Sequence, residues 1–469
     1  MKTISVASLQ QGMNMPLTQK EFRTDFERYL KVASVRRCDV VVGSELGAAM
    51  IGLPFVERGH REALARIREG QNPKAGILTR LRGSATKLNP GWSTGQTQTL
   101  VLKALVAHRK QIWEYYDNTF GRLAKKYEVV LVAPSAWLWD PVDGRMRNIA
   151  CVYDRDGTRV GYQAKVLVNR NERKLARPGT GWQPIETSVG NIGLALGHDA
   201  LIPEVGRLFA SRGASVLVSQ LACRTDLEWG RAHRATLMRC MENQLFGAVS
   251  CLVGRDRLDP DPEADAPYRG HSMMLAPIEL SPKGNGILVQ TDHPQRQSMV
   301  VCTLDYEALQ LIWESSEPAF RQEFSRVWNL YSRSLVPEGD SSRLLPEQVL
   351  MDPDGDAIVD SVAEPVEADA DPVVVVPPSP INHKEATGNS KPTPGNAARA
   401  ADDPDTGVAL VHGEELVVES TTLDDLHVMQ SRVVPWEPHP TTDQPPRQAY
   451  DPGDDLEDTR EMETLDQKG

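Results

Sequence analysis

Residues 191–222 read NIGLALGHDALIPEVGRLFASRGASVLVSQLA, and this stretch decides the fold. The apolar run NIGLALGHD predicts a strand, EVGRLFASRG has the apolar spacing of a helix, and SVLVSQLA is again rich in apolar and β-branched residues. A strand, a helix and a second strand in this order indicate an α/β protein, in which helices cover a sheet.

The same order extends outward in both directions over residues 1–320. Two sheet layers with helices outside them would accommodate all of these segments, which predicts a four-layer α-β-β-α sandwich of about 320 residues. The expected strands are TISVASLQ, CDVVVGSE, VVLVAPSAW, RNIACVYD paired through a DRDG turn with RVGYQAK, SCLVGRD, HSMMLAP and GILVQTD. The expected helices are LTQKEFRTDFERYLKVASVRR, NTFGRLAKKYE and AHRATLMRCMENQLFGA.

Charge is divided unevenly along the 469 residues, which carry a net charge of −12. Residues 336–469 hold 30 Asp and Glu against 8 Lys and Arg, so the preceding part is basic, with a net charge of +10. The same segment contains 17 of the 33 prolines, and its composition predicts a disordered, acidic, Pro-rich tail that solubilises the chain or covers an anion-binding surface. Two stretches within it, 358–376 and 413–436, are interpreted as weak linear recognition motifs.

Residues 56–105 fit no single expected element and are interpreted as an inserted basic lid or loop. Its cations could bind phosphate or nucleic acid, but the segment lacks a nucleic-acid motif and interleaved aromatic residues, so a solvated lid is favoured. These cations are Arg58, Arg61, Arg66, Arg68, Lys74, Arg80, Arg82 and Lys87.

No apolar run has the length of a signal peptide or a membrane span, which predicts a cytoplasmic protein without membrane contact. The six cysteines show no CxxC or zinc-type spacing and lie in apolar surroundings, so we expect reduced, buried thiols. The sequence also predicts no metal and no cofactor.

Three charged residues follow or end expected strands, where α/β folds place reactive groups. Glu45 follows the strand VVVGS, Lys165 ends GYQAK, and Glu172 comes shortly after. Hydrolysis of an amide or nitrile by a thiol needs a nucleophile, a carboxylate base and a fixed cation for the developing negative charge. A single Glu or Lys at a strand end is more often just solvated. The interpretation of these residues as a site is therefore strengthened mainly by their order along the chain.

That order resembles the carbon-nitrogen hydrolases of the nitrilase superfamily from Thr3 to about Trp313. The family pattern has a Glu at a strand end, a strand bearing an Asn, a Tyr and Lys step, a second Glu, a G-x-x-I-C-x-D strand leading into P-E and a helix, and a later helix with an E-N pair. In this chain the pattern is matched by Glu45, Asn148, Tyr162 with Lys165, Glu172 with Pro178-Gly179, IGLALGHD, IPEVGRLFASRGASVLV, RCMENQ and GHSMMLAP.

The resemblance places Gly193 on the family's Gly, Gly197 on its nucleophilic Cys and Asp199 on its Asp. It implies that Glu45 is the base, Lys165 the oxyanion partner and Glu172 a supporting acid, with Asn148, His198, Asp199 and Cys223 in or near the pocket. Because glycine has no side chain, these roles lack an attacking atom. The resemblance also implies a homodimer or a larger homo-oligomer.

Three functions remain open. The first is a nitrilase-like protein that has lost the thiol mechanism and binds a small amide- or nitrile-like ligand or a partner in the old pocket. The second is an active amidase or nitrilase with a relocated group, either Cys223, which follows the strand SVLVSQLA, or His198 acting as nucleophile or as base for water. The third is a scaffold whose basic lid and acidic tail bind macromolecules.

Overall fold

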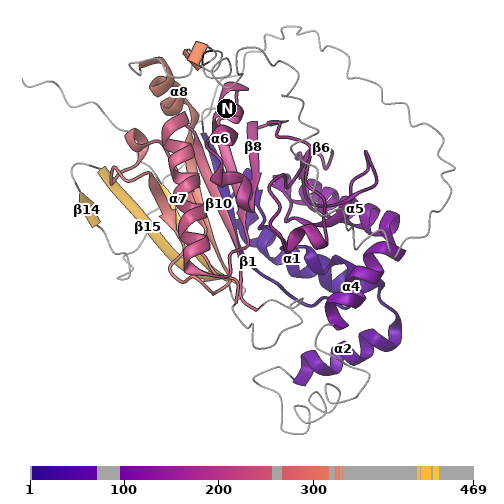
Figure 1. Ribbon diagram of the computed structural model, residues 1–469. Helices are drawn as coiled ribbons and strands as arrows, with labels where there is room; N and C mark the ends of the chain where they lie inside the picture. Colours follow the sequence, from indigo (N-terminus) through magenta and orange to yellow (C-terminus); the bar gives the residue numbers. More distant parts are fainter. Residues whose placement is uncertain are drawn as a thin grey trace, which may run out of the picture. The chain divides into compact units, whose positions relative to one another are not determined.

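Alternate side chains of the strands point into two different apolar layers, and the strands form two sheets. The computed structural model describes residues 3–70, 96–255 and 267–315, a few positions between 323 and 330, and the segments 409–411, 414–423 and 426–432. Hydrogen bonding is continuous between the sheets, because β1 pairs with β2 through Val6–Ser8 and with β10 through Gln10–Gly12. The two sheets therefore join at β1 and β10 and separate beyond them (Figure 1).

The first sheet has the order β13-β1-β2-β3-β5-β6, with β4 also paired to β5. Its strands are β1 (Thr3–Gly12), β2 (Val40–Val42), β3 (Val130–Val132), β4 (Ala136–Trp139), β5 (Met146–Tyr153), β6 (Arg159–Ala164) and β13 (Ser298–Asp305). The second sheet runs β7-β8-β9-β10-β11-β12, with β8, β9 and β10 parallel. Its strands are β7 (Ile185–Thr187), β8 (Gly190–Leu196), β9 (Val216–Leu221), β10 (Phe246–Val253), β11 (Met273–Leu275) and β12 (Ile287–Gln290).

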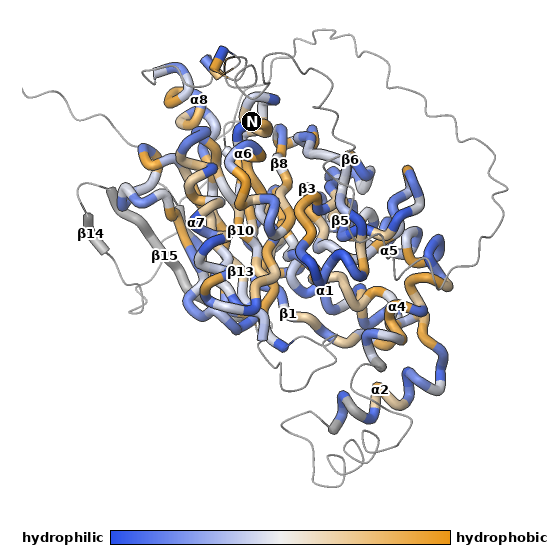
Figure 2. Tube along the Cα trace, viewed as in Figure 1, coloured by the Kyte–Doolittle hydropathy of each residue, from blue (hydrophilic) through white to orange (hydrophobic). Residues whose placement is uncertain are grey.

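Three apolar clusters show that the sheets pack face to face with helices outside. In β2, Val40 and Val42 join a cluster that also contains Leu194 and Val218 of the second sheet, whereas Val41 faces the helices. The helices over the first sheet are α1 (Gln19–Val35) and α5 (Arg109–Tyr127), and those over the second are α6 (Pro203–Ser211) and α7 (Asp226–Asn243). Figure 2 shows the strands labelled β3, β8 and β10 as largely hydrophobic. The expected α-β-β-α layering is therefore confirmed.

Close packing of α6 onto β8 depends on a glycine. A Cβ at Gly193 would lie 2.6 Å from Cγ of Phe209, which is fully buried on α6. The absence of a side chain at Gly193 thus lets α6 approach β8 closely.

The inserted segment differs from the expected loop at both of its ends. It contains α2 (Arg58–Gly70) and α4 (Gln96–Ala107), and residues 71–95 lie outside the described residues. Arg61 and Arg68 of α2 donate hydrogen bonds to the carbonyls of Leu17 and Met15, and Arg68 also pairs with Glu21. These arginines therefore anchor the helix to the body. Arg58 pairs with Glu62 and Arg66 donates to the Glu62 carbonyl within the same helix, while Lys74, Arg80, Arg82 and Lys87 lie outside the described residues.

Helix α7 begins earlier and ends earlier than the sequence pattern predicts. Thr225 and Glu228 form a capping box at its start, and Gln244, with φ of 51°, ends it in a left-handed turn. Phe246–Ala248, expected in this helix, instead begin β10.

Within the tail that was predicted to be disordered, the structure describes residues 409–411, 414–423 and 426–432. This part forms β14 (Ala409–Val411), β15 (Glu414–Leu423) and β16 (Leu426–Arg432), and β16 joins the first sheet beside β13. The first sheet thus gains an edge from a segment that follows α8 (Tyr306–Ser315) by a long stretch of sequence. The stretch 358–376 and the rest of the tail lie outside the described residues. Within the described part of the chain, no helix is long and apolar enough to cross a membrane.

Truncation of the layer between the sheets should destabilise the fold strongly. Leu194 is fully buried there, so Leu194→Ala should lower the free energy of unfolding by about 2–5 kcal/mol in urea denaturation, through lost burial and the cavity left behind. Val142, which is 82% exposed, provides the matched control, and Val142→Ala should change it by less than about 0.5 kcal/mol. Equal effects of the two substitutions would contradict the assigned layer.

Candidate active site

A buried ammonium group lies at the centre of the site. Lys165 follows β6, where its backbone N–H donates to the carbonyl of Asn148 on β5. Lys165 is only 2% exposed. Its Nζ donates to Glu45 Oε1 at 2.8 Å and also to a carboxylate oxygen of Glu172. Asn148 adds a second donor, from Nδ2 to the same Glu45 oxygen at 3.1 Å. The structure therefore brings Glu45, Lys165, Glu172 and Asn148 together, as the motif order suggested.

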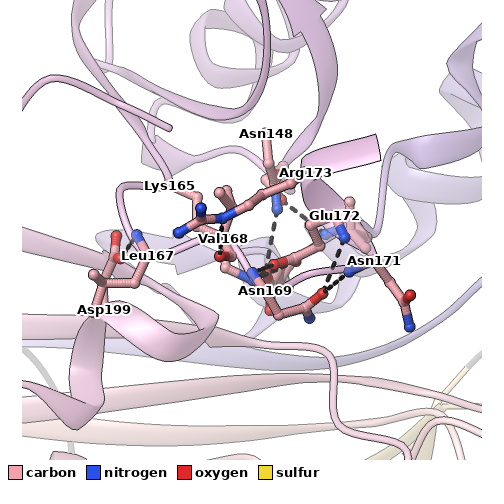
Figure 3. Close-up of polar contacts among 12 residues, drawn as sticks. Asn148, Lys165, Leu167, Val168, Asn169, Asn171, Glu172, Arg173 and Asp199 are labelled. Carbon is pink, nitrogen blue, oxygen red and sulfur yellow. Dashed lines mark hydrogen bonds and ion pairs between the residues drawn. The ribbon is translucent and has the colours of Figure 1, made fainter. Parts of the chain in front are cut away.

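Glu172 is positioned by the tight turn that precedes it. The side-chain oxygen of Asn169 accepts hydrogen bonds from the backbone N–H groups of Asn171 and Glu172, both at 2.9 Å. In return, Glu172 Oε2 accepts the backbone N–H of Asn169 at 2.9 Å (Figure 3). This reciprocal pair starts the short helix η2 (Glu172–Lys174) and directs the carboxylate back toward Lys165.

Asp199 has a structural position beneath the site. It is fully buried, and its Oδ1 accepts the backbone N–H groups of Leu167 at 2.7 Å and Val166 at 3.2 Å. Burial raises the pKa of this carboxyl, while these backbone hydrogen bonds oppose that shift. Asp199 thereby fastens the segment after Lys165 to the helix η3 (Gly197–Leu201).

Gly197 lies directly against the charged cluster, where β8 ends and η3 begins. Its φ is +53°, a left-handed conformation that side-chain-bearing residues rarely adopt. A Cβ at this position would lie 2.7 Å from Glu45 Oε2 and 2.8 Å from Lys165 Nζ. The carboxylate and the ammonium therefore occupy the space in which a side chain at residue 197 would begin.

Burial and charge set the protonation of the cluster. Desolvation raises the pKa of Glu45 to about 7, although the Lys165 ammonium opposes this shift. For Lys165, burial disfavours the charged form, but the carboxylates of Glu45 and Glu172 outweigh it and raise the pKa. Lys165 is therefore a permanent cation at neutral pH, while Glu45 is poised to hold or release a proton.

A cavity of about 630 Å³ opens above this cluster. Its lining includes Glu45, Lys165, Glu172 and Gly197, and also His198 and Cys223. Further lining residues that sequence reasoning missed are Gln98, Trp137, Asn169, Asn171, Lys174, Leu175, Leu201, Arg224, Glu228, Arg231 and Tyr268, among others. Arg224 directly follows Cys223 at the end of β9, so the strand-end rule that singled out Cys223 applies equally to it. No local signal identified Gln98, which comes from the inserted helix α4.

His198 and Cys223 present different chemistry to this cavity. Burial lowers the pKa of His198, and the Lys165 charge lowers it further, so the ring is neutral at pH 7. Its Nδ1 is buried and makes no hydrogen bond within the described part of the chain. Burial raises the pKa of the Cys223 thiol, and the nearby Glu45 carboxylate raises it further, so the sulfur stays protonated. Of the two, the imidazole is the group ready to contact a ligand.

The described residues contain no cluster of three or more His, Cys, Asp or Glu side chains that could hold a metal ion.

The raised pKa of Glu45 predicts a specific pH dependence of stability. An unfolded Glu loses its proton at about pH 4.3, so between that pH and about 7 the folded chain holds a proton that the unfolded chain has released. The contribution of Glu45 to the free energy of unfolding is therefore full below this window and falls as pH rises through it. Relative to Glu45→Gln, the unsubstituted protein should lose on the order of 1–3 kcal/mol from pH 4.5 to 7.5 in urea denaturation. Parallel pH curves for the two proteins would contradict the raised pKa.

Known proteins are similar in sequence to parts of this chain. Residues 118–279 match a family model described as carbon-nitrogen hydrolase. The chain is 25% identical over 308 residues to a probable hydrolase, YhcX, of Bacillus subtilis, an alignment that covers 65% of this chain and 50% of that protein. It is also 25% identical over 224 residues to the chloroplastic omega-amidase of Arabidopsis thaliana, covering 45% of this chain and 55% of the plant protein. The chain thus spans about half the length of these two relatives.

Solved structures with a similar fold include a bacterial carbon-nitrogen hydrolase. The carbon-nitrogen hydrolase from Helicobacter pylori G27 superposes with a TM-score of 0.50 and 19% sequence identity, over 72% of this chain and 99% of the bacterial one. This likeness concerns the fold.

Proposed function

We propose that this chain, which carries a carbon-nitrogen hydrolase domain of the nitrilase superfamily, binds a small amide- or nitrile-like ligand in its cavity without the thiol-dependent hydrolysis of that superfamily. The observation that carries the proposal is the surroundings of Gly197. The base and the cation of a hydrolytic site lie beside this residue, but it offers no side chain for them to activate.

The position of Gly197 supports its alignment with the nucleophile. A nucleophile must lie within hydrogen-bond reach of its base and close to the cation that stabilises the oxyanion. A Cβ at residue 197 would lie within 2.8 Å of both Glu45 Oε2 and Lys165 Nζ, so this residue is adjacent to both groups, as a nucleophile must be. With glycine there, Glu45 and Lys165 pair with each other at 2.8 Å.

The surroundings of Cys223 and His198 disfavour a relocated nucleophile. The buried Cys223 thiol has a raised pKa and therefore little thiolate at neutral pH, and the thiolate is the attacking form. The neutral His198 ring could accept a proton from water, but such a mechanism forgoes the covalent intermediate. An active amidase with a relocated group remains the second candidate, with His198 as its favoured base.

The cavity suits a small ligand with both hydrogen-bond donors and acceptors. Lys165 supplies a cationic donor, Glu45 a carboxyl group, and His198 a buried ring nitrogen without a partner among the described residues. Trp137 and Leu201 add apolar surface for a short carbon chain. An amide, with one carbonyl oxygen and one NH₂ group, matches this set.

The scaffold hypothesis receives less support. Two arginines of the basic insert make their hydrogen bonds to the body of the protein, so they act as anchors of α2. We also propose a cytoplasmic location and a homo-oligomeric state, on the analogy with the superfamily.

Ligand binding can be tested with small amides and nitriles. We expect acetamide, butyramide or a related nitrile to raise the melting temperature of the full chain in a saturable manner, because a ligand that binds the folded state stabilises it. His198→Ala should weaken binding about 2- to 10-fold, the worth of one hydrogen bond. His60→Ala serves as the matched control, since His60 is half-exposed on α2 and its Nδ1 lies 3.7 Å from Glu57. A panel without any saturable ligand, or equal affinity of the His198 variant, would contradict the proposed role.

A further inference from the structure

The cavity above Lys165 is larger than a short amide needs. Its volume is about 630 Å³, which lies within the range of about 300–1,000 Å³ that holds drug-sized ligands. An amide of four carbons bound at the Glu45 and Lys165 end would leave much of this space to water. The outer part of the lining is therefore available to a second group on the ligand.

This outer part of the lining, the mouth of the cavity, is rich in cations. Lys174, Arg224 and Arg231 belong to it, and all three are exposed or half-buried. Among the described lining residues, Glu228 is the one carboxylate outside the buried cluster. Its Oε2 accepts the backbone N–H groups of Arg224 at 2.8 Å and Thr225 at 3.4 Å, because Glu228 belongs to the capping box of α7. The mouth therefore carries an excess of positive charge.

Helix α7 and the turn before it place two of these cations. Glu228, Arg231 and Ala232 are three and four residues apart, so they share the face of α7 that borders the cavity. The guanidinium carbon of Arg224 lies 5.2 Å from the centre of the Tyr268 ring, which also lines the cavity. Both arginines thus come from the segment that follows β9.

Lys174 reaches the mouth from a different element. It ends η2, two residues after Glu172, so the Asn169 turn that positions Glu172 also positions the backbone of Lys174. Lys174 and Arg231 are exposed, and neither forms an ion pair within the described part of the chain. Two cations on separate elements therefore border one cavity.

We infer that Lys174 and Arg231 form an anion-binding subsite at the mouth, and that the ligand is an amide with a carboxylate at its far end. This inference rests on the proposed function, in which the amide binds at Glu45 and Lys165. The planar guanidinium of Arg231 matches a carboxylate, and the ammonium of Lys174 adds a second charge-assisted contact. A single negative charge suits this mouth, because Glu228 offsets part of its positive charge.

Matched pairs of ligands test the subsite in the full chain. Succinamate differs from butyramide only in that a carboxylate replaces the terminal methyl group, and glutaramate with pentanamide and adipamate with hexanamide extend the series. We expect at least one of these amide acids to bind about 3- to 10-fold more tightly than its neutral partner in isothermal titration calorimetry. Raising the salt concentration from about 0.05 to about 0.5 M should reduce this difference in affinity, since salt screens exposed charges.

Substitutions at the mouth identify the cations responsible. Arg231→Gln should remove most of the difference in affinity between the amide acid and its neutral partner, and Lys174→Gln should reduce it as well. Both side chains are exposed, so these variants should keep the thermal unfolding transition. Arg234→Gln is the matched control and should keep the full difference, because Arg234 is an exposed arginine of α7 that does not line the cavity.

Three results would overturn the inference while the proposed function stands. The first is equal affinity of every amide acid and its neutral partner. The second is a difference in affinity that survives in both Arg231→Gln and Lys174→Gln. The third is binding of butyrate, which has a carboxylate but no amide, as tightly as the amide acids, since the mouth would then bind anions without the amide end. If no amide of the series binds, the proposed function fails together with the inference.

Discussion

The site depends on keeping one ammonium group charged where water hardly reaches it. Removing a cation from water costs several kcal/mol, and the structure offsets this cost by placing two carboxylates on Lys165. Each carboxylate in turn needs support, which Asn148 gives to Glu45 and the Asn169 turn gives to Glu172. Removal of either carboxylate would leave the buried Lys165 charge under-compensated, so the three charged groups depend on one another. The position of the segment that carries Lys165 then rests on Asp199 below it.

Gly197 leaves room for the direct ion pair within this cluster. A side chain at residue 197 would have to push the Glu45 carboxylate and the Lys165 ammonium aside and adopt an unfavourable positive φ. With glycine, the carboxylate and the cation pair directly and the cavity above them stays open. An ion pair of this kind stabilises a binding pocket as well as a catalytic one. A buried cluster of one lysine and two glutamates therefore does not by itself show hydrolysis.

The sequence allowed the layers and the charged cluster to be predicted for different physical reasons. Alternation in segments such as VVV at residues 40–42 reports directly which side chains face each layer, so the sandwich follows from local pattern. Glu45, Lys165 and Glu172 were singled out because each lies at or after a strand end and because their order along the chain resembles the family pattern. Their hydrogen bonds join residues up to 120 positions apart, and spacing alone does not give such contacts.

Two of the missed features, β16 and Gln98, depend on contacts between distant segments. β16 pairs with a strand more than a hundred residues earlier, and its acidic, proline-rich flanks gave a composition typical of disorder. Gln98 reaches the cavity because α4 packs against η1 (Ala49–Phe55), where Gly52 lets the carbonyl of Val101 approach closely. The start of α7 was different, since the Thr225 and Glu228 capping box is a local signal that apolar periodicity overlooked.

The central claim is that the cavity is retained while turnover by the thiol mechanism is lost, and ammonia release measures this most directly. A panel of short amides and nitriles would be incubated at neutral pH with the full chain and with Glu45→Gln, and ammonia would be quantified over hours. The account predicts that both proteins release no more ammonia than buffer does. Turnover by the unsubstituted chain that Glu45→Gln abolishes would contradict it, because Glu45 would then serve as the base of a working hydrolase.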